Sequence, residues 1–233
     1  HTFPTGTHAM WLYYGLATAG IHPLQQVRSL VVPPPQMVVN MKIGNMQGCC
    51  VGEPWNQRAI SENVGFTAAT SQQIWPDHPE KILGTRGDWV TAHPNTARAL
   101  TAAVLEAGRW IDASDANRQE TASIIAGRAV INTDVHAIAG LMQGRYENGL
   151  GQTWQDAHPM RFYHDGAVSF PWLSDGMWFL TQMKRWGLVK TAPDYAAVAR
   201  QINRIDIYKN AASAVGGISI PSSEMRSSTL IDG

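Results

Sequence analysis

Apolar positions over the first 85 residues alternate between helical spacing and short continuous runs. Helical spacing predicts a helix over residues 7–19, which Gly20 would end, and a short helix over residues 35–44. Continuous apolar runs predict three strands, over residues 27–32, 47–51 and 66–70. Three prolines follow the first of these runs and would end that strand. This order of strands, turns and helices predicts an α/β layer with a parallel sheet.

After about residue 85 the pattern becomes almost entirely helical. The longest apolar stripe, over residues 96–111, consists of Leu100, Ala103, Val104, Ala107, Trp110 and Ile111. Further helices are predicted over residues 116–129, 133–146, 173–188, 194–203 and 206–215. We therefore place a boundary near residues 85–90, with an α/β region over residues 1–85 and a helical region over residues 86–233.

The composition excludes several classes of protein. The 233 residues carry 18 basic and 18 acidic side chains, so the formal net charge is zero, and a general nucleic-acid binder would carry a basic excess. With 44% hydrophobic residues the chain is not disordered, and two cysteines cannot form a disulfide framework. No apolar run approaches the roughly 20 residues that a bilayer span needs.

Signatures of catalysis and of metal binding are scarce. The sequence contains no nucleophile elbow, zinc-protease motif, phosphate-binding loop or dinucleotide fingerprint, so we predict no catalytic residue. Cys49 and Cys50 would point to opposite faces of a strand, which favours buried thiols over redox or nucleophilic roles. His158 and His164 lie near Asp165, but their spacing is more typical of surface histidines than of metal ligands.

Two segments have the character of anion-binding turns. Thr5, Gly6, Thr7 and His8 lead into the first predicted helix, whose start offers free N–H groups and a partial positive charge. The alternative is that Thr5 or Thr7 is a simple helix cap and His8 a surface residue.

The second segment joins a predicted buried strand to a helix through Gly52, Glu53 and Pro54. Ligands of open α/β sheets bind at such turns, and Gly52 permits close approach to the backbone. The alternative is a turn with no ligand. Glu53 would repel an anion and should face away or hold a cation. Lys81 could supply the countercharge of a monovalent anion, although such a lysine is usually solvated.

These stretches resemble the substrate-binding proteins of nitrate, nitrite and bicarbonate ABC transporters. The resemblance covers essentially the whole chain, and the matching stretches are Thr2–His8, Pro33–Met37, Cys50–Trp55, Asp77–Lys81, Asp175–Leu180 and Lys184–Gly187. It implies an α/β, periplasmic-binding-protein-like fold of type II, in which two lobes close on the ligand. It also implies a partial chain: a full member would carry roughly another lobe before His1. Residues 1–85 would then form most of the second lobe, and the helix-rich residues 86–233 would return to pack on the first.

The resemblance also assigns roles to individual residues. His8 matches a cleft histidine, Gly52 a backbone contact near the anion, and Lys81 the lysine of nitrate binders. Bicarbonate-binding relatives carry an acidic residue at that position and use calcium, so Lys81 favours nitrate or nitrite without a metal. Thr5 and Thr7 are further candidate ligands. One positive charge and several N–H donors would suit a planar monoanion.

The expected function is therefore a solute-binding component that delivers nitrate or nitrite to a membrane permease, in or facing the periplasm. It would perform no chemistry and need no cofactor. One alternative of the same fold is a cytoplasmic nitrate and nitrite sensor that holds a regulatory partner. Another is an enzyme similar to the pyrimidine synthases of thiamine biosynthesis, which carry a longer cysteine-rich motif than Cys49-Cys50.

Overall fold

The computed structural model describes residues 1–233, and its regular secondary structure is mainly helical. The α-helices are α1 (Thr7–Thr18), α2 (Met37–Lys42), α3 (Trp55–Ser61), α4 (Ser71–Ile74), α5 (Gly87–Ala92), α6 (Pro94–Asp112), α7 (Asp115–Ala126), α8 (His136–Met142), α9 (Leu173–Arg185), α10 (Tyr195–Ile202) and α11 (Ile205–Val215). Short 3₁₀ helices occupy Pro34–Gln36 and His164–Gly166. Strands β1 (Arg145–Glu147) and β2 (Thr153–Gln155) form an antiparallel hairpin with Tyr146 opposite Trp154.

The helix predictions are confirmed almost throughout. The helix over residues 7–19 is α1, and Gly20 follows it with a φ of 77°, in the left-handed region that favours glycine. The main difference is the helix predicted over residues 133–146. It ends at Met142, and Gly144, with a φ of 77°, turns the chain into β1.

The three strands predicted over residues 27–32, 47–51 and 66–70 are wrong for this chain, because none of them pairs with another strand. A strand needs a neighbour to accept and donate its backbone hydrogen bonds. Residues 30–32 have only His1 beside them: His1 N donates to Leu30 O at 3.2 Å, and Val32 N donates to His1 O at 3.0 Å. These two bonds have the pattern of one step of a parallel ladder. The apolar runs therefore form extended segments without the predicted parallel sheet.

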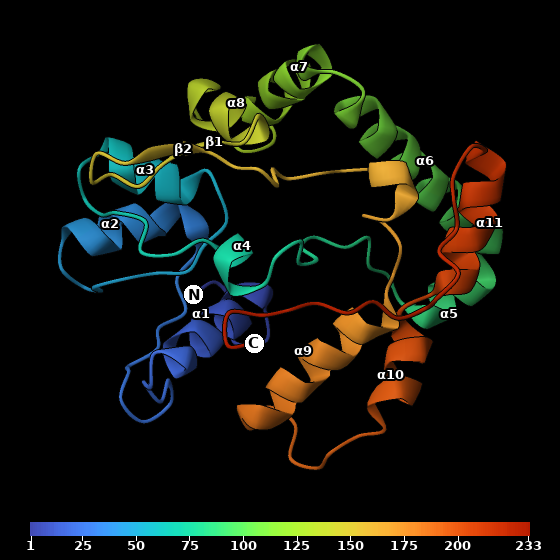
Figure 1. Cartoon of the computed structure of the whole chain (residues 1–233), viewed down its shortest axis with the longest axis horizontal. Coiled ribbons are helices and arrows are strands. Elements are labelled where there is room, and N and C mark those ends of the chain that lie inside the picture. Colours follow the sequence, from blue (N-terminus) through green and yellow to red (C-terminus); the bar gives the residue numbers. More distant parts are fainter.

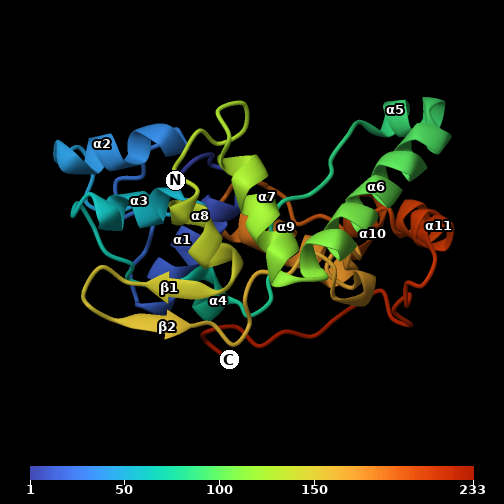
Figure 2. The same ribbon diagram turned by 90° about the horizontal axis from the view of Figure 1, so that it is seen from above.

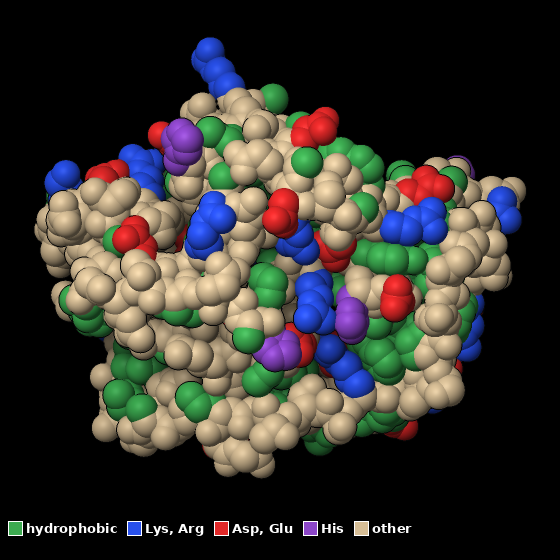
Figure 3. Space-filling view, turned by 45° about the horizontal axis from the view of Figure 1, so that its top comes forward, with side chains coloured by type: hydrophobic (Ala, Val, Ile, Leu, Met, Phe, Trp, Pro, Cys, Tyr) green, Lys and Arg blue, Asp and Glu red, His purple; other side chains and the backbone are tan.

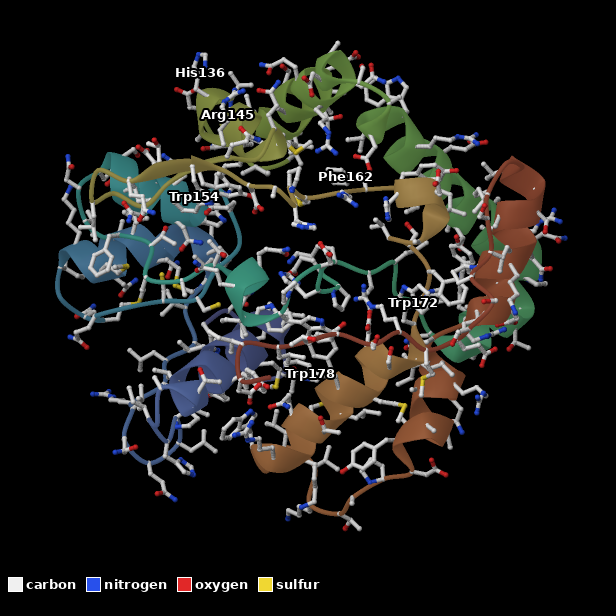
Figure 4. All side chains as sticks on the ribbon, in the orientation of Figure 1. His136, Arg145, Trp154, Phe162, Trp172 and Trp178 are labelled. Carbon is white, nitrogen blue, oxygen red and sulfur yellow. The ribbon has the colours of Figure 1, made fainter.

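An aromatic core joins α1 to α9 across about 170 residues of sequence. Trp11 and Tyr14 of α1 pack with Trp75 and with Trp178 of α9. The ring centroid of Trp178, which is labelled in Figure 4, lies 5.2 Å from that of Trp11 and 4.7 Å from that of Trp75. Aromatic residues bury large areas in edge and tilted contacts such as these. This core fixes the start of α1 relative to the segment that follows α4.

A second core lies between α6, α10 and α11 and includes Leu105 and Tyr208. Figure 2 shows α5, α6 and α11 at one end of the molecule and α2 and α3 at the other. The apolar stripe predicted on α6 does not face this core: Leu100 and Val104 are each 45% exposed. Helix α6 packs through its other face, where Ala97, Leu105 and Gly108 are buried.

The last residues return from α11 to the start of the chain. In Figure 1 this red segment runs past α9 to end near α1. Leu173 N donates to Glu224 O, and Ile231 N donates to Ile74 O, both at 2.9 Å. Tyr14 donates its hydroxyl proton to Asp232. The C-terminal residues thus lie beside the aromatic core, where Leu230 packs against it.

The surface carries both signs of charge. On the face in Figure 3, acidic, basic and histidine side chains are interspersed among hydrophobic ones. None of the helices combines the length and the apolar character that a membrane crossing requires.

Candidate anion-binding site

The start of α1 presents free backbone donors. Gly6 is the N-cap and makes no side-chain cap bond, so neither Thr5 nor Thr7 caps the helix. Ala9 N and Met10 N donate to Gly6 O, whereas the N–H groups of Thr7 and His8 have no acceptor within the chain. A helix start with unpaired N–H groups carries partial positive charge. This end of α1 can therefore interact favourably with an anion.

The His8 ring is oriented by Thr2 and faces Gly52. Its Nδ1 lies 3.0 Å from Thr2 Oγ1. A Cβ atom placed on Gly52 would stand 3.4 Å from Nε2 of the same ring. If the Thr2 hydroxyl donates to Nδ1, the neutral imidazole carries its proton on Nε2, on the side of Gly52. The structure thus brings His8 and Gly52 together although 44 residues of sequence separate them.

The protonation of His8 depends on its surroundings. Burial lowers the pKa of His8 below its ordinary value of 6.5; Glu80 opposes this shift, while Lys81 and the N-terminal amine add to it. At neutral pH the ring is therefore mainly uncharged. It would offer an anion one N–H donor, and Lys81 would be the formal positive charge nearby.

Lys81 lies on the extended segment between α4 and α5, which crosses the middle of Figure 1. Its Nζ donates to Glu80 Oε1 at 2.6 Å. The same oxygen accepts a hydrogen bond from the Thr7 hydroxyl at 3.4 Å. Glu80 therefore connects Lys81 to the start of α1. The Lys81 side chain itself is 79% exposed.

Several interactions hold the segment that carries Glu80 and Lys81. Thr70 and Gln73 form a capping box at the start of α4. The two nitrogens of His78 interact with Ser71 Oγ at 2.7 Å and with Pro79 O at 2.9 Å. Its ring also packs on Trp11, with centroids 4.7 Å apart. From the C-terminal segment, Arg226 donates to Asp77 O at 3.1 Å.

The turn around Gly52 differs from the prediction in detail. No strand precedes it, and α3 begins at Trp55 and has seven residues, so the turn contributes backbone rather than a long helix dipole. Glu53 accepts a hydrogen bond from Gln57 N at 3.0 Å, which turns its carboxylate toward α3. Burial raises the pKa of Cys50 to about 12, with a further increase from Cys49. A thiol with so high a pKa is protonated at neutral pH and a poor nucleophile.

Four of the five predicted ligands thus lie in one neighbourhood: Thr7, His8, Gly52 and Lys81. Thr5 is exposed, and its side chain makes no hydrogen bond to this group. Thr2 and Glu80 also contact these residues, and the sequence did not indicate either of them. Thr2 lies six residues before His8, but no pattern indicates that the chain folds back there. Glu80 directly precedes Lys81 in the sequence. An acidic residue next to the predicted countercharge could have indicated its role.

Two other hollows lie away from these residues. The larger, of about 550 Å³, lies between α8 and the hairpin and includes His136, Arg145 and Trp154 (Figure 4). The second, of about 310 Å³, is lined by polar residues that include Asp112, Arg118 and His164. His158 pairs with Asp77 and His164 with Arg161, so the two histidines have different partners. No group of three His, Cys, Asp or Glu side chains could hold a metal ion.

A family model described as the NMT1-like family matches residues 1–126. The nitrate/nitrite binding protein NrtA of Nostoc sp. is 40% identical over all of this chain and 53% of that protein. The bicarbonate-binding protein CmpA of Synechococcus sp. is 34% identical over all of this chain and 54% of that protein. The chain therefore spans about half the length of the curated relatives it matches.

The fold is that of the periplasmic solute-binding proteins. The crystal structure of the periplasmic nitrate-binding protein NrtA from Synechocystis superposes with a TM-score of 0.93 at 39% identity, over all of this chain and 61% of that one. This confirms the α/β, periplasmic-binding-protein-like fold class and the helix-rich second half. The chain belongs to the NMT1-like family.

Proposed function

We propose that this chain supplies one side of the anion site of a solute-binding protein, which captures nitrate or nitrite for an ABC importer. The observation that carries the proposal is the convergence of His8, Gly52, Thr7 and Lys81 from three separate segments. Together they offer an imidazole N–H, free helix N–H groups, a hydroxyl and one ammonium. That set matches a planar monoanion with three weakly basic oxygens.

Lys81 is the residue that would select the ligand. Its ammonium would balance the charge of nitrate or nitrite directly. The similarity to NrtA at 40% identity, compared with 34% for CmpA, supports the same choice. The raised pKa of Cys50 argues only against this thiol as a nucleophile.

We further propose that residues 1–85 carry the anion-binding turns of one lobe, and that the helices of residues 86–233 pack against the other. The exposed apolar stripe of α6, with Leu100 and Val104, supports this arrangement because such a stripe usually meets a partner surface. The other lobe would supply the remaining ligands. Closure of the lobes in the periplasm would present the loaded form to a membrane permease.

The proposal is tested by calorimetric titration of the full-length protein with nitrate, with nitrite, and with bicarbonate in the presence and absence of calcium. Nitrate or nitrite should bind without calcium, and bicarbonate should bind far more weakly. Calcium-dependent binding of bicarbonate alone would overturn the proposal.

A further inference from the structure

Glu80 occupies the donors that an anion would use. Its Oε1 accepts hydrogen bonds from both Lys81 Nζ, at 2.6 Å, and the Thr7 hydroxyl, at 3.4 Å. Both donors belong to the proposed anion site. A carboxylate is itself a planar monoanion that accepts hydrogen bonds through its oxygens, so it resembles nitrate in charge and shape.

The ion pair between Glu80 and Lys81 is weak enough for a bound anion to replace Glu80. The side chain of Lys81 is 79% exposed and that of Glu80 is 36% exposed. Exposed ion pairs contribute little net free energy, because water screens the charges and the side chains lose freedom. Breaking this ion pair therefore costs a competing anion little free energy.

A nitrate ion could also make contacts that Glu80 does not. His8 Nε2 and the free N–H groups of Thr7 and His8 have no acceptor within the chain. Nitrate has three oxygens, so it can bind Lys81 and still reach these donors. The additional hydrogen bonds would favour the exchange of the carboxylate for the ligand.

We propose that Glu80 is an internal competitor of the anion, which holds Lys81 beside Thr7 in the empty site and releases it when nitrate binds. This inference rests on the proposed function. Glu80 then sets the affinity in two ways: it must give up Lys81, and its charge remains close to the incoming anion. Its removal strengthens binding, whereas removal of a residue that merely positions Lys81 would weaken binding.

The test compares nitrate affinity in the full-length protein and in its Glu80→Gln variant by calorimetry. We expect roughly three- to ten-fold tighter binding in Glu80→Gln, the scale of an exposed ion pair and a nearby like charge. Glu106→Gln on α6 is the matched control, since Glu106 is exposed and makes no ion pair. It should bind nitrate like the wild type.

A second measurement reads the contact itself without nitrate. The acetylation rate of Lys81, followed by mass spectrometry, should rise in Glu80→Gln because the ammonium loses its partner, while Lys190 should react at an unchanged rate. An unchanged Lys81 rate would overturn the proposal, and so would equal or weaker nitrate binding in Glu80→Gln. If the wild type and both variants all fail to bind nitrate, the proposed function fails and the competitor role with it.

Discussion

The guanidinium of Arg226 forms a two-point pair with the carboxylate of Asp175, with Nε to Oδ1 at 2.9 Å and Nη2 to Oδ2 at 2.7 Å. A third hydrogen bond runs from Nη1 to Asp77 O at 3.1 Å. Arg226 thus ties the C-terminal segment and α9 to the chain three residues before Glu80. Burial raises the pKa of Asp175, and Arg226 opposes this shift. The pair therefore compensates a buried charge and also holds the segment that carries Glu80 and Lys81.

Arg226→Met should lower the free energy of unfolding by about 2–3 kcal/mol, because it leaves Asp175 buried without its partner. Urea denaturation measures this loss. The double variant Arg226→Met with Asp175→Asn should recover part of the stability, because the uncompensated charge is gone. Equal stability of Arg226→Met and wild type would contradict this role of the pair.

Gly52→Ala should weaken nitrate binding roughly ten-fold, or about 1.4 kcal/mol. The added methyl group would stand 3.4 Å from His8 Nε2, the donor that we propose for the anion. Gly48→Ala is the matched control, since a Cβ there meets nothing within 4 Å. Calorimetry should find weaker nitrate binding in Gly52→Ala and unchanged binding in Gly48→Ala. Tight nitrate binding by Gly52→Ala would remove Gly52 from the site.

The pH dependence of stability should report the environment of His8. Its pKa in the folded protein lies below the ordinary value of 6.5. As the pH falls through 6.5, His8 becomes protonated in the unfolded chain while it is still mainly neutral in the folded protein. This residue therefore reduces stability below pH 6.5 and contributes no dependence well above it.

We expect the unfolding free energy of the wild type to fall more steeply between pH 7 and pH 5 than that of His8→Gln. His136→Gln removes an exposed histidine and should leave the slope as in the wild type. Denaturation at several pH values provides the comparison. Identical slopes for the wild type and His8→Gln would show that the pKa of His8 is not lowered.

The 233-residue chain by itself should bind nitrate at least 100-fold more weakly than the full-length protein. If the other lobe supplies ligands and excludes water, the isolated residues leave the anion exposed on one side, where each contact is screened. Parallel titrations of the two proteins measure the difference. Equal affinities would place the complete site within these residues and refute the division between lobes.

Local periodicity predicted most of the fold, and contacts distant in sequence account for what it missed. Helices such as α1 and α6 depend on spacing within one segment, so their positions could be read directly. The sequence of residues 27–32 could not show whether they form a strand, because a strand needs a pairing partner. Their backbone pairs only with His1. Likewise, the stripe with Leu100 predicted a helix correctly but could not show which face α11 would cover.

In the candidate site, too, local sequence indicated some residues, whereas others depend on contacts distant in sequence. His8, Gly52 and Lys81 were singled out by residue type and resemblance, and the fold brings them near one another. The roles of Thr2 and Glu80 depend on distances that no local pattern encodes: 3.0 Å from Thr2 to His8, and 3.4 Å from Thr7 to Glu80. Thr5 remains a prediction that no hydrogen bond supports.

Reversal of the charge at Lys81 tests the anion site most directly. Lys81→Glu in the full-length protein should weaken nitrate binding by a factor of roughly 100 or more, about 2.7 kcal/mol, because the only nearby side-chain ammonium becomes a second carboxylate beside Glu80. Lys190→Glu makes the same change in net charge at an exposed site and should bind nitrate normally. Calorimetry that finds unchanged nitrate affinity in Lys81→Glu would contradict the assignment of these residues as a nitrate site.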